Sequence, residues 1–266
     1  MISGYLLCLY RPDILFVGAV SFILYFCHSG NKLIYSERTA MPWLKSLFFI
    51  ACLTGVINSS QAGVLVGGTR VIYDGAKKEA SLSVTNQDKN IPYLIQSWVD
   101  NTEASNNKKV PFIITPPLFR LDAGQESNLR ILFSGGNLPQ DRESVYWLNV
   151  KTIPSSQKSD GNQLFISIKN RIKLFYRPAG LAGSAADAYK ALSFSRHGKQ
   201  LQISNPTAYH VSFHTLKVAD SEIKGALMVA PKSTLNVDLP AGAAGTVSWQ
   251  AINDFGGTSD VATASL

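Results

Sequence analysis

Apolar and polar residues alternate in short runs along the chain from residue 63 onward. The runs are rich in Val, Ile, Thr, Tyr and Trp, and Gly, Asn, Asp and Pro separate them, which is typical of half-buried strands joined by turns. A helical period is indicated only near residues 185–191. The pattern therefore predicts an all-β chain with strands over residues 64–73, 80–86, 91–99, 111–115, 127–133, 145–153, 163–176, 191–196, 199–204, 209–217, 225–229, 233–238 and 246–252.

The segment RPAGLAG, residues 177–183, divides these predicted strands into a group of about seven and a group of about six. Its Pro and Gly residues break regular structure directly after the longest predicted strand. About seven short strands are the complement of one immunoglobulin-like (Ig-like) β-sandwich. We therefore expect an N-terminal Ig-like domain at 63–181 and a C-terminal one at 182–266.

The first 62 residues do not continue this pattern. From Met41 the chain has a basic Lys45, an apolar run over 47–57 and a small-residue end at Ala62, which together predict a secretory signal peptide at 41–62. Residues 1–40 then have no evident role, and an over-extended gene start is the favoured interpretation. The alternative is a membrane anchor at 14–27, although this run is short for a span of about 20 residues.

Cysteine usage and charge fit an exported protein. All three cysteines, Cys8, Cys27 and Cys52, lie in the leader, so the chain from residue 63 has no disulfide. An oxidising compartment permits disulfides without requiring them. From residue 63 the chain has 21 Lys and Arg against 16 Asp and Glu, and the whole excess lies before residue 182. No basic run exceeds two residues, which argues against nucleic acid and favours a basic site for a carboxylate.

The sequence offers little for catalysis. It contains no Gly-rich phosphate loop and no GxSxG elbow. His210 and His214 would lie about 13 Å apart along one strand, too far for one metal ion. Together with His197 they are predicted to be surface histidines. We expect neither an enzyme nor a bound metal or cofactor.

The segment LPQDRESVYWLNVKTIP, residues 138–154, combines a proline turn, a charged triplet and an alternating strand that ends at Pro154. It resembles the signature of periplasmic pilus-assembly chaperones of the chaperone/usher pathway. That signature runs aliphatic, Pro, any residue, Asp or Asn, basic, Glu, Ser, and later Asn, aliphatic and a final aliphatic-Pro. Every defined position is matched, and the resemblance extends over residues 63–266.

The resemblance implies two Ig-like β-sandwich domains set at an angle with a cleft between them. It also implies a non-enzymatic periplasmic chaperone that stabilises fimbrial subunits, pilins or an adhesin, and delivers them to an outer-membrane usher. The resemblance leaves open whether the free protein caps itself by forming a homodimer. The connection SSQKSDGN at residues 155–162 is short and not bracketed by cysteines, which resembles the subclass that assembles rigid, thick pili.

The strand predicted at 163–176 has aliphatic residues at alternate positions, Leu164, Ile166 and Ile168. In a β-protein of unknown family this face would pack into its own sandwich. The resemblance implies instead a donor strand, whose aliphatic side chains fill the groove of a fimbrial subunit that lacks its final strand. The physical basis is β-augmentation, in which main-chain hydrogen bonds give affinity and alternate side chains fill pockets.

The resemblance also assigns two groups of charges. Arg70 and Lys173 match the basic residues that anchor the carboxylate at the C-terminus of the subunit. Lys173 has the opposite parity to Ile168, so an unbroken strand would place it on the other face, whereas a bulge would change this. Glu143, Arg177 and Asp254 match an ionic network between the domains; without the resemblance they would be unrelated surface charges.

Two other functions remain as alternatives. A general holdase for exported proteins would bind without requiring a free C-terminus. A structural subunit of the fibre would be a single incomplete sandwich, often with a disulfide. The two expected domains and the absence of cysteine after residue 62 argue against the subunit.

Overall fold

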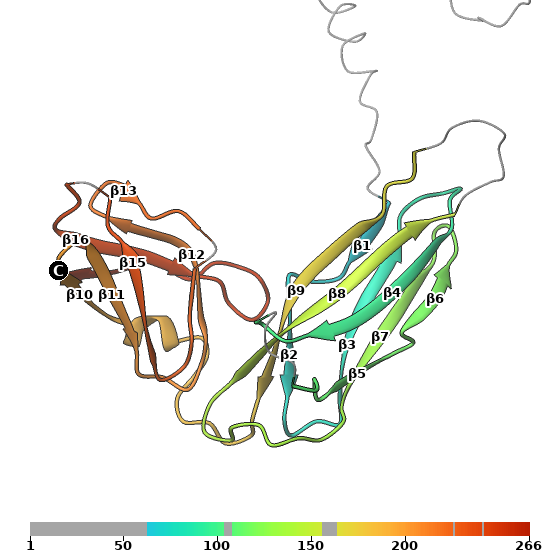
Figure 1. The fold of residues 1–266 in the computed structure, drawn as a ribbon, viewed down its shortest axis with the longest axis horizontal. Coiled ribbons are helices and arrows are strands. Elements are labelled where there is room, and N and C mark those ends of the chain that lie inside the picture. Colours follow the sequence, from blue (N-terminus) through green and yellow to red (C-terminus); the bar gives the residue numbers. More distant parts are fainter. Residues whose placement is uncertain (1–62, 104–107, 156–163, 226, 241) are drawn as a thin grey trace, which may run out of the picture. The chain divides into compact units, whose positions relative to one another are not determined.

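The computed structural model describes residues 63–103, 108–155, 164–225, 227–240 and 242–266 (Figure 1). The signal peptide predicted at 41–62, residues 1–40 and nearly all of the connection at 155–162 lie outside the described residues. Within the described ranges, no helix is long and apolar enough to cross a bilayer.

Strands form almost all of the regular structure in the described residues. They are β1 (Val64–Val66), β2 (Arg70–Asp74), β3 (Glu79–Asn86), β4 (Tyr93–Asp100), β5 (Phe112–Thr115), β6 (Leu118–Leu121), β7 (Glu126–Phe133), β8 (Ser144–Pro154), β9 (Ile168–Arg177), β10 (Ser193–His197), β11 (Gln200–Asn205), β12 (Val211–Val218), β13 (Ser221–Glu222), β14 (Met228–Val229), β15 (Ser233–Asp238), β16 (Thr246–Ala251) and β17 (Ala262–Ser265), with one short 3-10 helix, η1 (Ala188–Ala191). The prediction of an all-β chain is confirmed.

The N-terminal domain is a sandwich of two sheets, in the strand orders β1-β3-β7-β5 and β2-β9-β8-β4-β6. Alternate residues of the strands point into a shared apolar core, as period two requires. The fully buried members include Val84, Ile95, Leu129, Leu148 and Leu174.

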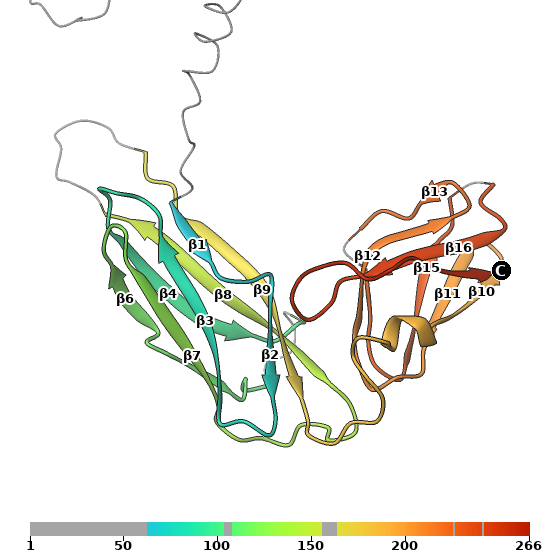
Figure 2. The ribbon, with the colours of Figure 1, turned by 180° about the vertical axis from the view of Figure 1, so that it is seen from behind.

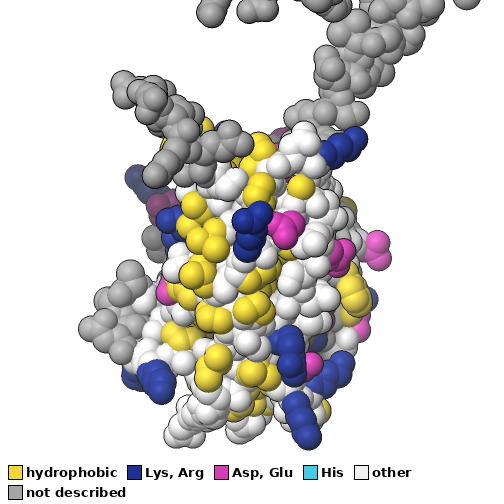
Figure 3. All heavy atoms as spheres, turned by 90° about the vertical axis from the view of Figure 1, so that its right-hand side faces the viewer, with side chains coloured by type: hydrophobic (Ala, Val, Ile, Leu, Met, Phe, Trp, Pro, Cys, Tyr) yellow, Lys and Arg dark blue, Asp and Glu magenta, His cyan; other side chains and the backbone are white. Residues whose placement is uncertain are grey.

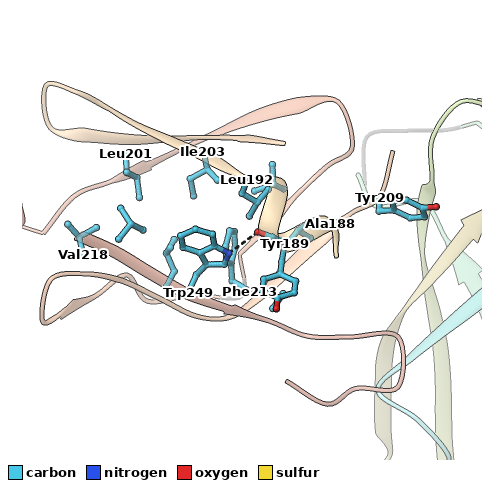
Figure 4. Packing of buried hydrophobic residues seen from close by; sticks show 14 of the residues in the cluster. Ala188, Tyr189, Leu192, Leu201, Ile203, Tyr209, Phe213, Val218 and Trp249 are labelled. Atoms are coloured by element: carbon cyan, nitrogen blue, oxygen red, sulfur yellow. Dashed lines mark hydrogen bonds between the residues drawn. The ribbon is translucent and has the colours of Figure 1, made fainter. Parts of the chain in front are cut away.

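The C-terminal domain packs the sheet β10-β11-β15 against a second sheet built on β13-β12-β16-β17, with β14 beside β12. Its core surrounds Trp249, whose Nε1 donates a hydrogen bond to the Tyr189 carbonyl in η1 at 3.0 Å (Figure 4). Burying an indole requires a partner for its N–H, and the short helix supplies it. The prediction of two Ig-like domains is confirmed.

The strand predicted at 64–73 is divided into β1 and β2, which join different sheets. At the switch, the Gly67 N–H donates to the Ser83 carbonyl at 2.8 Å, and a Cβ at residue 67 would collide with the Ser83 side chain. Only glycine allows this close approach, so the chain can cross from one sheet to the other there. Figure 2 shows β2 beside β9 after this switch.

The pattern missed three strands, β6, the two-residue β13 and β17, and misplaced the start of a fourth. β6 has four residues after Pro116-Pro117, and β17 has the sequence ATAS, in which only small alanines alternate with Thr and Ser. The strand predicted to begin at residue 163 begins at Ile168, and residues 164–167 form no strand pairing.

Apolar side chains gather on the outer surface that Figure 3 shows, with basic side chains among them. Exposed apolar residues of the N-terminal domain include Ile91, Leu94 and Leu118, separate from those at 164–168. The domain therefore leaves more than one apolar area exposed.

Candidate functional site

The strand β9 has two neighbours along only part of its length. It pairs with β8 from Ile168 to Tyr176, whereas the parallel β2 pairs with it only from Lys173 to Arg177. Over residues 168–172, one edge of β9 therefore has no partner strand among the described residues. Such an edge presents unpaired N–H and C=O groups that can accept another strand.

One face of β9 continues the core of the N-terminal domain toward this edge. Leu174 is fully buried and Ile172 packs against the same core. Ile168 is 58% exposed on that face, and outside the strand Ile166 and Leu164 are 67% and 86% exposed. The aliphatic residues singled out in the sequence therefore do not pack into their own sandwich.

The opposite face of β9 carries Lys173, Phe175 and Arg177. The register with β8 is continuous from Ile168 to Tyr176, without a bulge. Because side chains alternate along an unbroken strand, Lys173 lies on the face opposite to Ile168. This answers the question of parity that the sequence left open.

Arg70 and Lys173 are direct partners in the register of β2 and β9, so the two cations lie side by side. Lys173 Nζ donates to Ser212 Oγ at 3.3 Å, and Arg70 Nη1 donates to the Ile252 carbonyl at 3.0 Å. Arg70 Nε is buried without a hydrogen-bond partner. Neither cation forms an ion pair with the described residues.

Burial lowers the pKa of Lys173, and the nearby positive charge of Arg70 lowers it further. Burial also lowers the pKa of Arg70, although the charges of Asp254 and Glu143 oppose this change. Partly desolvated cations without a close carboxylate are stabilised when an anion binds. The geometry and electrostatics of this pair suit a carboxylate ligand.

Arg177 lies four residues beyond Lys173 on the same face, and all three nitrogens of its guanidinium group donate hydrogen bonds to carboxylates. Its Nε donates to Glu143 Oε1 at 2.7 Å, and its two terminal nitrogens donate to the Asp254 carboxylate at 2.8 and 2.9 Å. Burial lowers the pKa of Arg177, but the hydrogen bonds and charges of Asp254 and Glu143 outweigh it and raise this pKa. The two carboxylates singled out from the sequence thus both contact Arg177.

Glu143 has further partners in the C-terminal domain. Its side chain is 2% exposed, and Oε2 accepts the His210 backbone N–H at 2.8 Å and lies 3.2 Å from His210 Nδ1. The His210 ring also packs against Phe175, with the ring centroids 5.4 Å apart. Glu143, directly before β8, therefore forms hydrogen bonds with Arg177 in β9 and with His210 in the segment before β12.

The structure adds two residues that sequence reasoning missed, and it corrects one prediction. Ser212 and His210 lie 39 and 67 positions from their partners, so no local pattern could reveal these contacts. The prediction of a surface position for His210 is wrong, because its side chain is buried beside Glu143 and only 4% exposed. His197 and His214 are exposed, as predicted. The described residues contain no group of three metal-ligating side chains.

Comparison with known proteins identifies the family. The model of the pili and flagellar-assembly chaperone PapD N-terminal domain matches residues 63–182, and that of the pili assembly chaperone PapD C-terminal domain matches residues 187–263. The chain is 49% identical to the probable fimbrial chaperone LpfB of Escherichia coli O157:H7 over 227 residues, which cover 83% of this chain and 97% of that protein.

Two further similarities agree. The chain is 43% identical to the chaperone protein FimC of Escherichia coli K12, over 79% of this chain and 86% of FimC. A chain in the structure of the Salmonella enterica SafA pilin in complex with the SafB chaperone matches with a TM-score of 0.71 and 34% identity, covering 79% of this chain and 99% of that one. The chain therefore belongs to the family of two-domain pilus-assembly chaperones.

Proposed function

We propose that this protein is a non-enzymatic, ATP-independent periplasmic chaperone that binds fimbrial subunits by donating β9 and passes them to an outer-membrane usher. Residues 41–62 would direct its export, and no cofactor would take part. The similarity to proteins described as fimbrial chaperones, and to a structure of a chaperone with a pilin, supports this proposal.

The observation that carries the proposal is the unpaired edge of β9 at residues 168–172. A subunit that lacks one strand of its own sandwich can satisfy both its backbone and its groove at this edge. Leu164, Ile166 and Ile168 would then be covered, and each aliphatic side chain that becomes fully buried contributes about 1.5–3 kcal/mol. Residues 164–167 would join the strand when the partner pairs with it.

The basic pair determines the direction of the incoming strand. If a C-terminal carboxylate binds between Arg70 and Lys173, the last residue of the partner strand lies level with Lys173. The residues before it then lie alongside residues 168–172 of β9. It then runs parallel to β9, as β2 does from Lys173 onward. The partner strand would therefore end where β2 begins, and both would use the same edge of β9.

Ser212 is a third candidate ligand of that carboxylate. Its hydroxyl accepts a hydrogen bond from Lys173 Nζ, which leaves the hydroxyl proton free to donate to a carboxylate oxygen. Ser212 is buried in β12 of the C-terminal domain, so both domains would contact the end of the subunit. Hydrogen bonds to a charged group contribute about 1.5–3 kcal/mol each.

The experiment that tests the function is co-purification of the exported protein with a candidate fimbrial subunit. We expect a one-to-one complex with the wild type and its loss with Lys173→Ala or with a subunit that lacks its last residues. Lys217→Ala is the matched control, because Lys217 is an exposed strand lysine of the C-terminal domain. A complex that survives both changes would indicate a general holdase instead.

A further inference from the structure

The face of β9 opposite to its aliphatic residues is basic well beyond Lys173. Lys169 and Arg171 are exposed on this face, and Lys169 is the direct cross-strand partner of Lys151 in β8. All three cations therefore lie on one face of the sheet, Lys169 and Arg171 on the strand with the unpaired edge and Lys151 on its inner neighbour β8. We call Lys151, Lys169, Arg171, Trp98 and Trp147 the basic-aromatic face.

The two tryptophans form the floor of this face. The Arg171 guanidinium lies 4.5 Å from the ring centroid of Trp147, and Lys169 Nζ lies 5.9 Å from that of Trp98. Cations held over indole rings are oriented without losing their charge. Trp147 lies in β8 and Trp98 in β4, so both charged groups lean over the sheet from β9, the strand whose free edge a partner strand would pair with.

The charges of this face are not balanced locally. Asp100 lies in the same layer, and its Oδ2 already accepts from Trp98 Nε1 at 3.1 Å and from Asn149 Nδ2 at 3.0 Å. In the part of the chain that the structure describes, Lys151, Lys169 and Arg171 form no ion pair.

We infer that the basic-aromatic face selects fimbrial subunits whose C-terminal strand carries acidic side chains at alternate positions. Paired strands place their side chains on a common face, with opposite residues about 4.5–5.5 Å apart. With the terminal residue at the level of Lys173, the residues two and four positions earlier lie opposite Arg171 and Lys169. The intervening residues share the aliphatic face with Ile168 and Ile172.

The inference rests on the proposed function and extends it from a terminal carboxylate to the composition of the strand. Lys173 would recognise the end that all free C-termini share, whereas Lys169 and Arg171 would distinguish one subunit from another. Opposite charges at cross-strand positions are favourable, and like charges there are unfavourable. Discrimination therefore arises from repulsion of the wrong strand as well as from attraction of the right one.

The test uses the exported protein and two synthetic peptides with the same alternating apolar residues and a free C-terminus. One peptide carries Asp and the other Lys at the positions two and four residues before the end. Binding is measured by fluorescence anisotropy in low and high salt. We expect the wild type to prefer the Asp peptide by about tenfold. The preference should shrink in high salt, because exposed charges are screened.

The variant Lys169→Glu with Arg171→Glu should reverse the preference, whereas the control Lys199→Glu with Lys217→Glu, at exposed positions of the C-terminal domain, should retain it. Equal binding of the two peptides by the wild type, with loss of both on amidation of their C-termini, would overturn this inference and leave the proposed function intact. If neither peptide bound, or if amidation had no effect, the proposed function itself would fail.

Discussion

The two ends of β9 differ in their neighbours and in how their charges are satisfied. At the C-terminal end, strands pair on both edges and Arg177 is held by Glu143 and Asp254. At the N-terminal end, one edge is unpaired and Ile168 is exposed. The same strand thus stabilises the fold at one end and is available to a partner at the other.

Arg177 and Lys173 show this difference between two cations on one face. Arg177 donates three hydrogen bonds to carboxylates, whereas Lys173 donates one to a hydroxyl. Burial lowers the pKa of both side chains. Carboxylates offset this effect for Arg177, whereas no carboxylate offsets it for Lys173. We therefore expect Arg177 to act mainly in stability and Lys173 mainly in binding.

The largest effect is expected for Arg177→Ala. This change leaves Glu143 buried without its cation, and breaking a buried ion pair in this way costs about 3–5 kcal/mol. We expect the contact between the domains to loosen more than either sandwich unfolds, so that separate unfolding transitions appear. Denaturant unfolding followed by tryptophan fluorescence measures this. A single transition, displaced by less than 1 kcal/mol, would contradict the structural role of the network.

The next prediction compares how two aliphatic residues on one face of β9 affect the free energy of unfolding and the affinity for a subunit. Leu174→Ala should lower the free energy of unfolding by about 2–5 kcal/mol, because it opens a cavity in a close-packed core. Ile168→Ala should change it by less than about 0.5 kcal/mol, as is usual for an exposed site. For subunit binding we expect the reverse, with a loss of about tenfold or more for Ile168→Ala.

Both variants can be measured by thermal unfolding and by titration with the subunit. Loss of stability in Ile168→Ala would show that this residue serves the fold of the free protein. Unchanged affinity in the same variant would remove it from the donor strand.

The next prediction concerns Lys173→Ala, which should affect binding and leave the fold intact. Loss of a charge-assisted hydrogen bond should weaken the complex by about 1.5–3 kcal/mol. The stability of the free protein should stay the same or rise slightly, because a partly buried cation without a carboxylate is removed. Ser212→Ala should act in the same direction on binding, whereas Arg177→Lys should mainly affect stability. Unfolding of Lys173→Ala during purification would contradict this assignment.

The smallest effect concerns pH. In the folded protein the pKa of Lys173 lies below its ordinary value of 10.5. Folding therefore disfavours the charged form of this side chain relative to the unfolded chain. Below the lowered pKa, Lys173 therefore reduces stability. This reduction disappears as the pH rises through the folded pKa toward 10.5. The stability advantage of Lys173→Met over the wild type should narrow over that range, and an advantage that grows with pH would contradict the assignment.

The sequence predicted the fold well where strands follow the alternating pattern. It failed where a contact distant in sequence determines the structure. Gly67 ends β1 because the chain passes against Ser83, and in β17 only small alanines alternate with polar residues. Neither feature gives a strong signal in a local window of the sequence.

The candidate site was predicted in the same uneven way. Residues within the recognised segments, such as Arg70 and Lys173, could be singled out from the chain alone. Their adjacency depends on the parallel pairing of β2 with β9, which the sequence does not specify. Ser212 and His210 come from the other domain, and no spacing connects them to β8 or β9. The roles assigned to all these residues stay predictions that the experiments above test.

Donation of β9 to a subunit is tested most directly by hydrogen–deuterium exchange of this strand in the free protein and in its complex with a subunit. We expect new protection of backbone amides in residues 168–172 and little change in 173–177, where β2 already pairs with the strand. A subunit without its last residues should not give this protection. Unchanged exchange at 168–172 in a stable complex would contradict donation of β9.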